Sequence, residues 1–192
     1  TKRAAAAAAN PSMSSDALDY FSLLGVPPGF DLDEKSLEAA YIAKQREYHP
    51  DRLAKTDTVA RHKAIQLSAE INQAYQILKT PLSRAEYLLR QQGIEVHAEK
   101  GGVKPSQAIL LESLEVREHL MEASSADEIN RLREESNANI ARLWDAFRNA
   151  YQQKDWQNAA QTVIHLTFLT KFLHEIRVRE KICSLSPKGE RG

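Results

Sequence analysis

Apolar residues along most of this chain recur at every third or fourth position, which is the spacing of one face of an α-helix. The pattern is clearest over residues 58–79, where small and large residues alternate along one stripe. This stripe consists of Ala64, Ser68, Ile71, Tyr75 and Leu78. A second helix is predicted over 34–48, because Pro50 disfavours helical backbone in the residue before it. The two helices have comparable lengths, so we expect them to pack as an antiparallel hairpin with residues 49–51 at its tip.

Further helical patterns surround this hairpin. A short helix is predicted over 18–24 and another over 82–92, ended by Gly93. Three longer helices follow, over 105–122, 126–153 and 156–182. Pro105 suits the first turn of the first one, and Ser125 with Glu128 can form a capping box for the second. Short connections between long helices predict an antiparallel three-helix bundle and an all-α fold.

Glycine and mixed charges separate the two helical halves. Gly101-Gly102 lies within residues 94–104, which we therefore interpret as a linker. The predicted limits are an N-terminal domain over 16–93, a C-terminal bundle over 105–183 and a disordered tail over 184–192. Residues 1–12, with a run of alanines after Lys2-Arg3, are interpreted as a tag or a disordered segment. The remnant of an organelle-targeting segment is the alternative.

Composition excludes several classes of protein. Apolar residues make up 42% and charged residues 27%, which is typical of a globular chain. The formal net charge of +0 gives no overall basic footprint for nucleic acid. Cys183 is the single cysteine, so it forms no internal disulfide and cannot alone hold zinc or an iron–sulfur cluster. No stretch has the roughly 20 apolar residues that span a membrane. We therefore predict no metal, no cofactor, no nucleic-acid partner and no membrane partner.

The tip of the predicted hairpin carries the most specific motif. His49-Pro50-Asp51 follows Tyr48, and the next helix contains Ile71-Asn72-Gln73-Ala74-Tyr75-Gln76-Ile77-Leu78. Pro81, Arg84 and Tyr87 come next. This array resembles the J domain, which stimulates the ATPase of DnaK-type heat-shock chaperones.

The resemblance implies a chaperone-binding surface and no enzymatic activity of the chain itself. It assigns stimulation to His49, Pro50 and Asp51, with Lys44, Arg46 and Arg52 as the basic residues that meet an acidic chaperone surface. Lys35 is better explained as part of a solvated helix face. Ile42-Ala43 stands where many J domains carry a lysine–arginine pair, so we expect weaker or specialised electrostatic steering.

The second half resembles the HscB (Jac-type) family, J proteins dedicated to iron–sulfur cluster biogenesis. The matching segments are DYFSLLG, YHPDR, INQAYQIL, PLSRAEYLL, AILLESLEVREHLMEA and FLTKF, within about residues 18–180. The resemblance implies that the bundle binds an IscU-type iron–sulfur scaffold protein. The residues implied in this binding are Leu110, Leu111, Leu114, Glu115, Glu118, Glu122 and Phe168.

The residues themselves favour a docking face at this place. Leu110 and Leu111 are adjacent, so together with Leu114 they cannot all point into one narrow core stripe. At least one should be exposed, and exposed apolar patches mark partner sites. For Leu111 and Phe168, packing in the bundle core is the ordinary alternative.

Three other functions stay open at this point. The first is an enzyme or metal protein that uses His49 and Asp51 with another histidine, although no HExxH motif or cysteine pair is present. The second is a helical nucleic-acid module. The third is a J protein with a different client. For the HscB-like function we expect a bacterial cytoplasmic location, with the mitochondrial matrix as the alternative.

Overall fold

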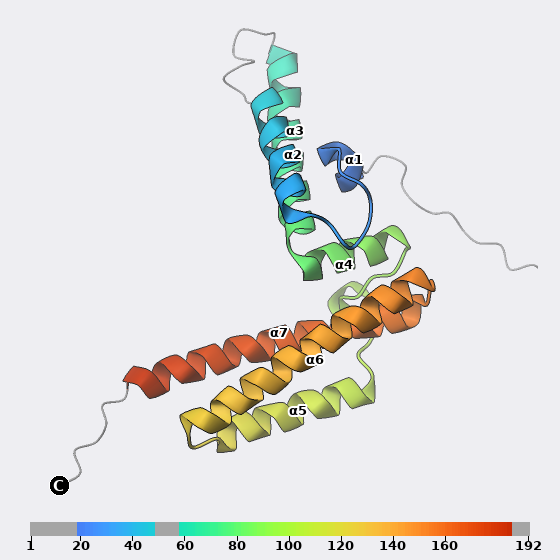
Figure 1. Ribbon diagram of the computed structural model, residues 1–192. Coiled ribbons are helices and arrows are strands. Elements are labelled where there is room, and N and C mark those ends of the chain that lie inside the picture. The colour runs from blue at the N-terminus through green and yellow to red at the C-terminus, as the bar shows by residue number, and fades with distance from the viewer. Residues whose placement is uncertain (1–18, 49–57, 186–192) are drawn as a thin grey trace, which may run out of the picture. The chain divides into compact units, whose positions relative to one another are not determined.

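The computed structural model describes residues 19–48 and 58–185 and divides the chain into two compact units (Figure 1). The first unit comprises the described parts of Thr1–Pro28 and Leu32–Gln76. The second comprises Gly29–Asp31 and the described part of Ile77–Gly192. The described residues form helices and no strand, which confirms the predicted all-α class.

Aspartates begin the two N-terminal helices of the first unit. The Asp19 side chain accepts a hydrogen bond from the Ser22 amide at the start of α1 (Tyr20–Leu24). The Asp33 side chain does the same for Ser36 in α2 (Glu34–Glu47). These carboxylates satisfy amides that have no partner within the helix and offset the positive end of its dipole. Asp33 is thus the N-cap of α2.

The predicted helix hairpin is confirmed in the first unit. Helix α3 (Thr58–Lys79) lies beside α2, and the Tyr41 and Tyr75 rings stack with their centroids 4.1 Å apart (Figure 1). On the α3 stripe, Ala64, Ile71 and Tyr75 are buried and Ser68 is half-buried. The alternation of small and large residues therefore allows α2 and α3 to pack closely along one face, as the pattern predicted.

The second unit contains the three-helix bundle and α4 (Pro81–Gln91), which packs on α7. The bundle helices are α5 (Gln107–Glu122), α6 (Ala126–Gln152) and α7 (Trp156–Leu185), and α6 with α7 form the most extensive contact. The Ser125–Glu128 capping box is present at the start of α6. The expectation that Pro105 occupies the first turn of α5 is wrong. Ser106 caps this helix by accepting from the Ile109 amide, so the proline precedes it.

Residues 94–104, expected to be a linker, form an ordered loop with the short 3₁₀ helix η2 (Ala98–Lys100). The Gly102 amide donates to the His97 carbonyl at 3.1 Å, and the Val103 amide donates to the Glu95 carbonyl at 2.8 Å. A Cβ at position 102 would lie 2.8 Å from the His97 oxygen, so only glycine fits this fold of the loop. The predicted domain limits stay predictions, since a packed unit and a sequence domain need not end at the same residue.

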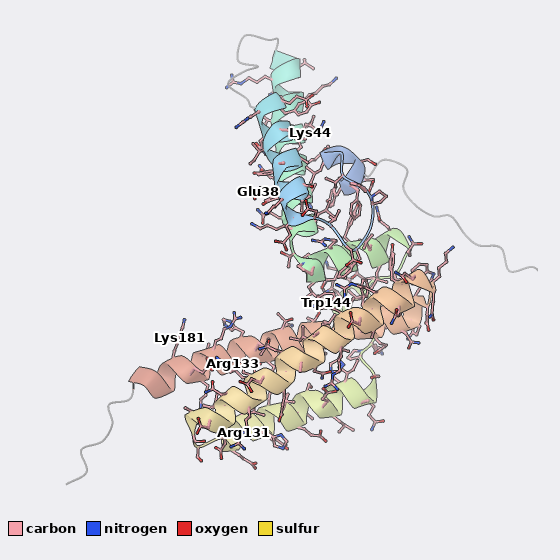
Figure 2. All side chains as sticks on the ribbon, viewed as in Figure 1. Glu38, Lys44, Arg131, Arg133, Trp144 and Lys181 are labelled. Atoms are coloured by element: carbon pink, nitrogen blue, oxygen red, sulfur yellow. The ribbon has the colours of Figure 1, made fainter. Side chains whose placement is uncertain are left out.

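Phe30 is anchored within the second unit. Its ring stacks on Trp144 of α6, which is labelled in Figure 2, with the ring centroids 5.1 Å apart. The Arg148 guanidinium lies 5.4 Å from the centroid of the Phe30 ring. The buried Arg84 of α4 donates to the carbonyls of Phe30 and Leu78. These bonds satisfy a buried cation that would otherwise strongly destabilise the fold.

Candidate partner-binding surfaces

The last turn of α2 carries the described part of the predicted chaperone-binding surface. Arg46 is exposed, and the Lys44 ammonium lies 3.4 Å from the Glu47 carboxylate and 5.8 Å from the centre of the Tyr48 ring (Figure 2). Both basic side chains are therefore at the surface, beside the residues that connect α2 to α3. His49, Pro50, Asp51 and Arg52 lie outside the described residues, so their assigned role stays a prediction.

Two hydrogen bonds to one side chain of α3 hold α2 against α3. Tyr41 Oη and Gln45 Nε2 both donate to Asn72 Oδ1, at 2.8 and 2.7 Å. One amide oxygen thereby joins two successive turns of α2 to one position of α3. The sequence pattern contained Asn72 but assigned it no role, because its partners lie 27 and 31 residues away.

The outward side of α5 exposes the three leucines that the resemblance singled out. Leu110, Leu111 and Leu114 are 43%, 51% and 58% exposed, while Ile109 and Leu120 on the opposite side are buried. The prediction that at least one of these leucines is exposed is confirmed, and all three are exposed. The alternative that Leu111 packs in the bundle core is wrong, because α5 turns Ile109 and Leu120 to the core and Leu111 to solvent.

A row of carboxylates borders these leucines. Glu115, Glu118 and Glu122 are all exposed, and they follow one another at steps of three and four residues along α5. Within the described part of the chain, none of the three forms an ion pair with another side chain. The outward side of α5 is thus an apolar strip with an unpaired acidic edge.

Phe168 of α7 is half-buried and lies at the seam between α5 and α7. It lines a small cavity together with Ser113 and Arg117 of α5. Ser113 and Arg117 each stand three residues after an exposed leucine, so they are the helical neighbours of Leu110 and Leu114. Phe168 therefore shares this cavity with residues one turn from Leu110 and Leu114, whereas the sequence only placed both helices in one bundle.

An ion pair that sequence reasoning missed fixes this seam. Arg117 Nε donates to both carboxylate oxygens of Glu175 at 3.0 and 3.2 Å, and Arg117 Nη2 donates at 3.0 Å. Such a fork geometry is the strong form of an arginine–carboxylate pair. No local signal could have revealed it, because the partners are 58 residues apart.

A second polar group lies deeper in the same seam. Asn139 of α6 donates to Glu112 Oε1 at 2.9 Å, and His165 Nε2 of α7 lies 3.1 Å from Glu112 Oε2. The His165 nitrogen is buried and not aligned for a hydrogen bond, so this contact is a true ion pair only when the imidazole is protonated. Glu112 thereby contacts α6 and α7, in contrast to the exposed carboxylates of Glu115, Glu118 and Glu122.

The described residues contain neither a candidate metal-ligand cluster nor a candidate membrane-spanning helix. Across residues 19–48 and 58–185, no three His, Cys, Asp or Glu side chains are grouped as a metal ion would require. No described helix combines the length and the apolar composition needed to cross a membrane.

Comparisons with known proteins match both halves of the chain. The DnaJ domain matches residues 19–87, and the HSCB C-terminal oligomerisation domain matches residues 105–177. The co-chaperone protein HscB of Proteus mirabilis is 36% identical over 168 residues, which cover 85% of this chain and 96% of the relative.

Solved structures give the same correspondence. The chaperone HscB from Vibrio cholerae has a TM-score of 0.75 at 34% identity, covering 86% of this chain and 99% of the other. The human co-chaperone protein HscB has a TM-score of 0.76 at 27% identity, covering 90% and 85%. The order of a J-like half followed by a three-helix bundle is therefore shared along the whole matched length.

Proposed function

The chain belongs to the HscB family of J-domain co-chaperones, and we propose that it couples two partners. One is a DnaK-type chaperone such as HscA, whose ATPase it stimulates. The other is an IscU-type iron–sulfur scaffold protein, which it delivers to that chaperone so that cluster assembly and transfer proceed. The cluster is cargo of the scaffold in this proposal. The bacterial relative supports action in a bacterial cytoplasm.

The outward side of α5 is the observation that carries the proposal for the scaffold. Three leucines of one helix are exposed, although the same helix has buried apolar residues available for its own bundle. An apolar strip with a charged border is typical of a protein–protein interface, in which the apolar centre supplies affinity and the border supplies orientation. Phe168 extends the apolar area across the seam to α7. In a well-packed contact each such side chain contributes about 1–3 kcal/mol of binding free energy.

The proposal for the chaperone rests on α2 and on the hydrogen bonds that join α2 to α3. Lys44 and Arg46 offer positive charge at the surface, and Asn72 holds the hairpin together. A rigid tip can favour one conformation of a partner only when it contacts that conformation better than the other. We infer that His49, Pro50, Asp51 and Arg52 make those contacts together with Lys44 and Arg46.

The chaperone half of the proposal is tested by ATPase stimulation. His49→Gln keeps a side chain of similar polarity but removes the imidazole, so we expect stimulation of a purified DnaK-type chaperone to be lost. Lys35→Gln, on the first turn of α2, is the matched control and should stimulate as the unchanged chain does. Full stimulation by His49→Gln would contradict the assignment of the tip.

The scaffold half is tested by binding. Leu110→Ala, Leu114→Ala and Phe168→Ala combined should weaken binding of a purified IscU-type scaffold by more than about 30-fold, since several apolar contacts are lost together. A J protein with a different client is the second candidate. Unchanged scaffold binding by the triple variant would reject these residues, and no binding by the unchanged chain would favour that second candidate.

A further inference from the structure

Met121 is an exposed side chain that the scaffold-binding set leaves out. It is 80% exposed, the highest value among the large apolar side chains of the described residues. An isolated exposed apolar residue needs no explanation, but one that continues an apolar strip enlarges a candidate contact area. The position of Met121 relative to the three leucines therefore decides whether Met121 belongs to the candidate contact area.

Helix geometry places Met121 on the same line as Leu110 and Leu114. At 100° per residue, the three side chains leave α5 within about 40° of one another. Met121 lies about 10 Å beyond Leu114 along the helix axis, and the whole line from Leu110 is about 16 Å long. The strip thus continues nearly to the end of α5 at Glu122.

Arg117 occupies the turn between Leu114 and Met121. Its guanidinium is bound to Glu175 of α7 and donates to the Ser113 carbonyl at 2.9 Å, so its charge is directed toward the bundle. The aliphatic part of an arginine side chain can cover an apolar surface while its charged end is bound elsewhere. Arg117 therefore leaves the strip uninterrupted by a free cation.

The surroundings of Met121 are acidic. Glu118 lies one turn before it and Glu122 directly after it, and both carboxylates are exposed. A partner that covers Met121 must therefore bring lysine or arginine side chains beside an apolar patch.

We propose that Met121 is a further scaffold-contact residue that extends the binding face of α5 to the end of the helix. The inference rests on the proposed function, because its occupant is the scaffold protein proposed above. Continuity with the leucine strip favours that occupant, and the acidic edge of α5 disfavours a second copy of this chain docking through the same face. A copy docking through the same face would offer Arg117 as its only arginine or lysine on α5, and this residue is already paired with Glu175.

Binding of a purified IscU-type scaffold to single variants tests the inference. Met121→Ala should weaken binding about three- to tenfold, and Met121→Lys should weaken it further, because it places a cation opposite the basic residues of the partner. Met121→Leu should bind as the unchanged chain does, since it keeps the apolar volume. Ile65→Ala on α3 is the matched control, as Ile65 is also apolar and 46% exposed but belongs to the first unit.

The outcomes separate this inference from the function on which it rests. If the triple leucine and phenylalanine variant loses binding while the Met121 variants keep it, the face ends at Leu114 and the inference fails alone. If neither loses binding, the proposed scaffold site fails as well. An equal loss in Ile65→Ala would also overturn the role of Met121. The role of Met121 in scaffold binding would also be overturned if the unchanged chain self-associates and Met121→Lys abolishes this self-association. A second copy of the chain would then be the occupant.

Discussion

Asn72 shows how one side chain can hold the two helices of the hairpin together. Its oxygen accepts from Tyr41 and Gln45, while the Tyr41 ring stacks on Tyr75 of the same helix as Asn72. Polar and aromatic contacts therefore fix the same pair of helix faces. Hydrophobic periodicity predicts which faces of the helices are buried. The structure adds which hydrogen-bond donor bonds to which acceptor.

Asn72→Ala should lower the stability of the hairpin by about 1 kcal/mol, since it removes one acceptor and leaves two partly exposed donors to water. Urea denaturation followed by circular dichroism measures the change. Gln73→Ala, at the exposed neighbouring position, is the control and should have little effect. Equal stability of Asn72→Ala and the control would show that the tyrosine stack alone holds the two helices.

At the scale of the helices, local contacts determine where a helix begins, and long-range contacts determine which side it turns to solvent. The start of α6 is encoded locally: Ser125 accepts from the Glu128 amide, and the Glu128 carboxylate accepts from the amides of Ser124 and Ser125. The orientation of α5 is not local, because the Gln161 side chain accepts from the Ser106 amide and donates to the Lys104 carbonyl. Capping motifs therefore predict where a helix begins but not which side it turns to solvent.

The capping box predicts a pH effect on stability. Hydrogen bonds from the Ser124 and Ser125 amides lower the pKa of Glu128 below its ordinary value of 4.5. A carboxylate whose pKa is lowered by folding stabilises the folded state above its unfolded pKa, and this contribution is lost as the pH falls through the folded pKa. Glu128→Gln should therefore reduce stability at neutral pH and have a smaller effect in acid. Urea titrations of both chains at neutral pH and below pH 4.5 measure the difference, and an equal effect at both pH values would contradict it.

The acidic edge of α5 predicts a salt effect on binding. Replacing Glu115, Glu118 and Glu122 together by glutamine removes the charges that we expect to face basic groups of the scaffold. Scaffold affinity should fall about tenfold at low salt, with most of the change in the association rate, and the difference should shrink at high salt. Glu134→Gln on α6 is an exposed control that lies outside this edge. An unchanged salt dependence would remove the charges from the proposed interface.

At the scale of the whole molecule, the two proposed surfaces lie in different units, each with its own buried core. The hairpin of the first unit buries Leu37 and Ile71, and the bundle of the second buries Phe147 and Phe172. Substitutions on one surface should therefore leave the other intact. Delivery of a client further requires both surfaces on one chain, since the covalent link supplies the high effective concentration.

A mixing experiment tests this requirement. His49→Gln should still bind scaffold, and the triple leucine and phenylalanine variant should still stimulate the chaperone alone. An equimolar mixture of the two should not restore the extra stimulation that scaffold produces with the unchanged chain. Restoration by the mixture would mean that scaffold and tip act independently, and the delivery role would be wrong.

The sequence alone was sufficient for the helices, their order, the hairpin and the family, because helical periodicity, caps and the motif around His49 are local signals. It also predicted that the leucines of α5 could not all be buried, since neighbouring residues of a helix point in different directions. Only the tertiary structure decided that all three are exposed, that Phe168 lines the seam between α5 and α7, and that Arg117 is bound to Glu175. These facts depend on which side of α5 faces α7, and contacts between residues far apart in the chain determine that choice. The exposed line that ends at Met121 became visible for the same reason.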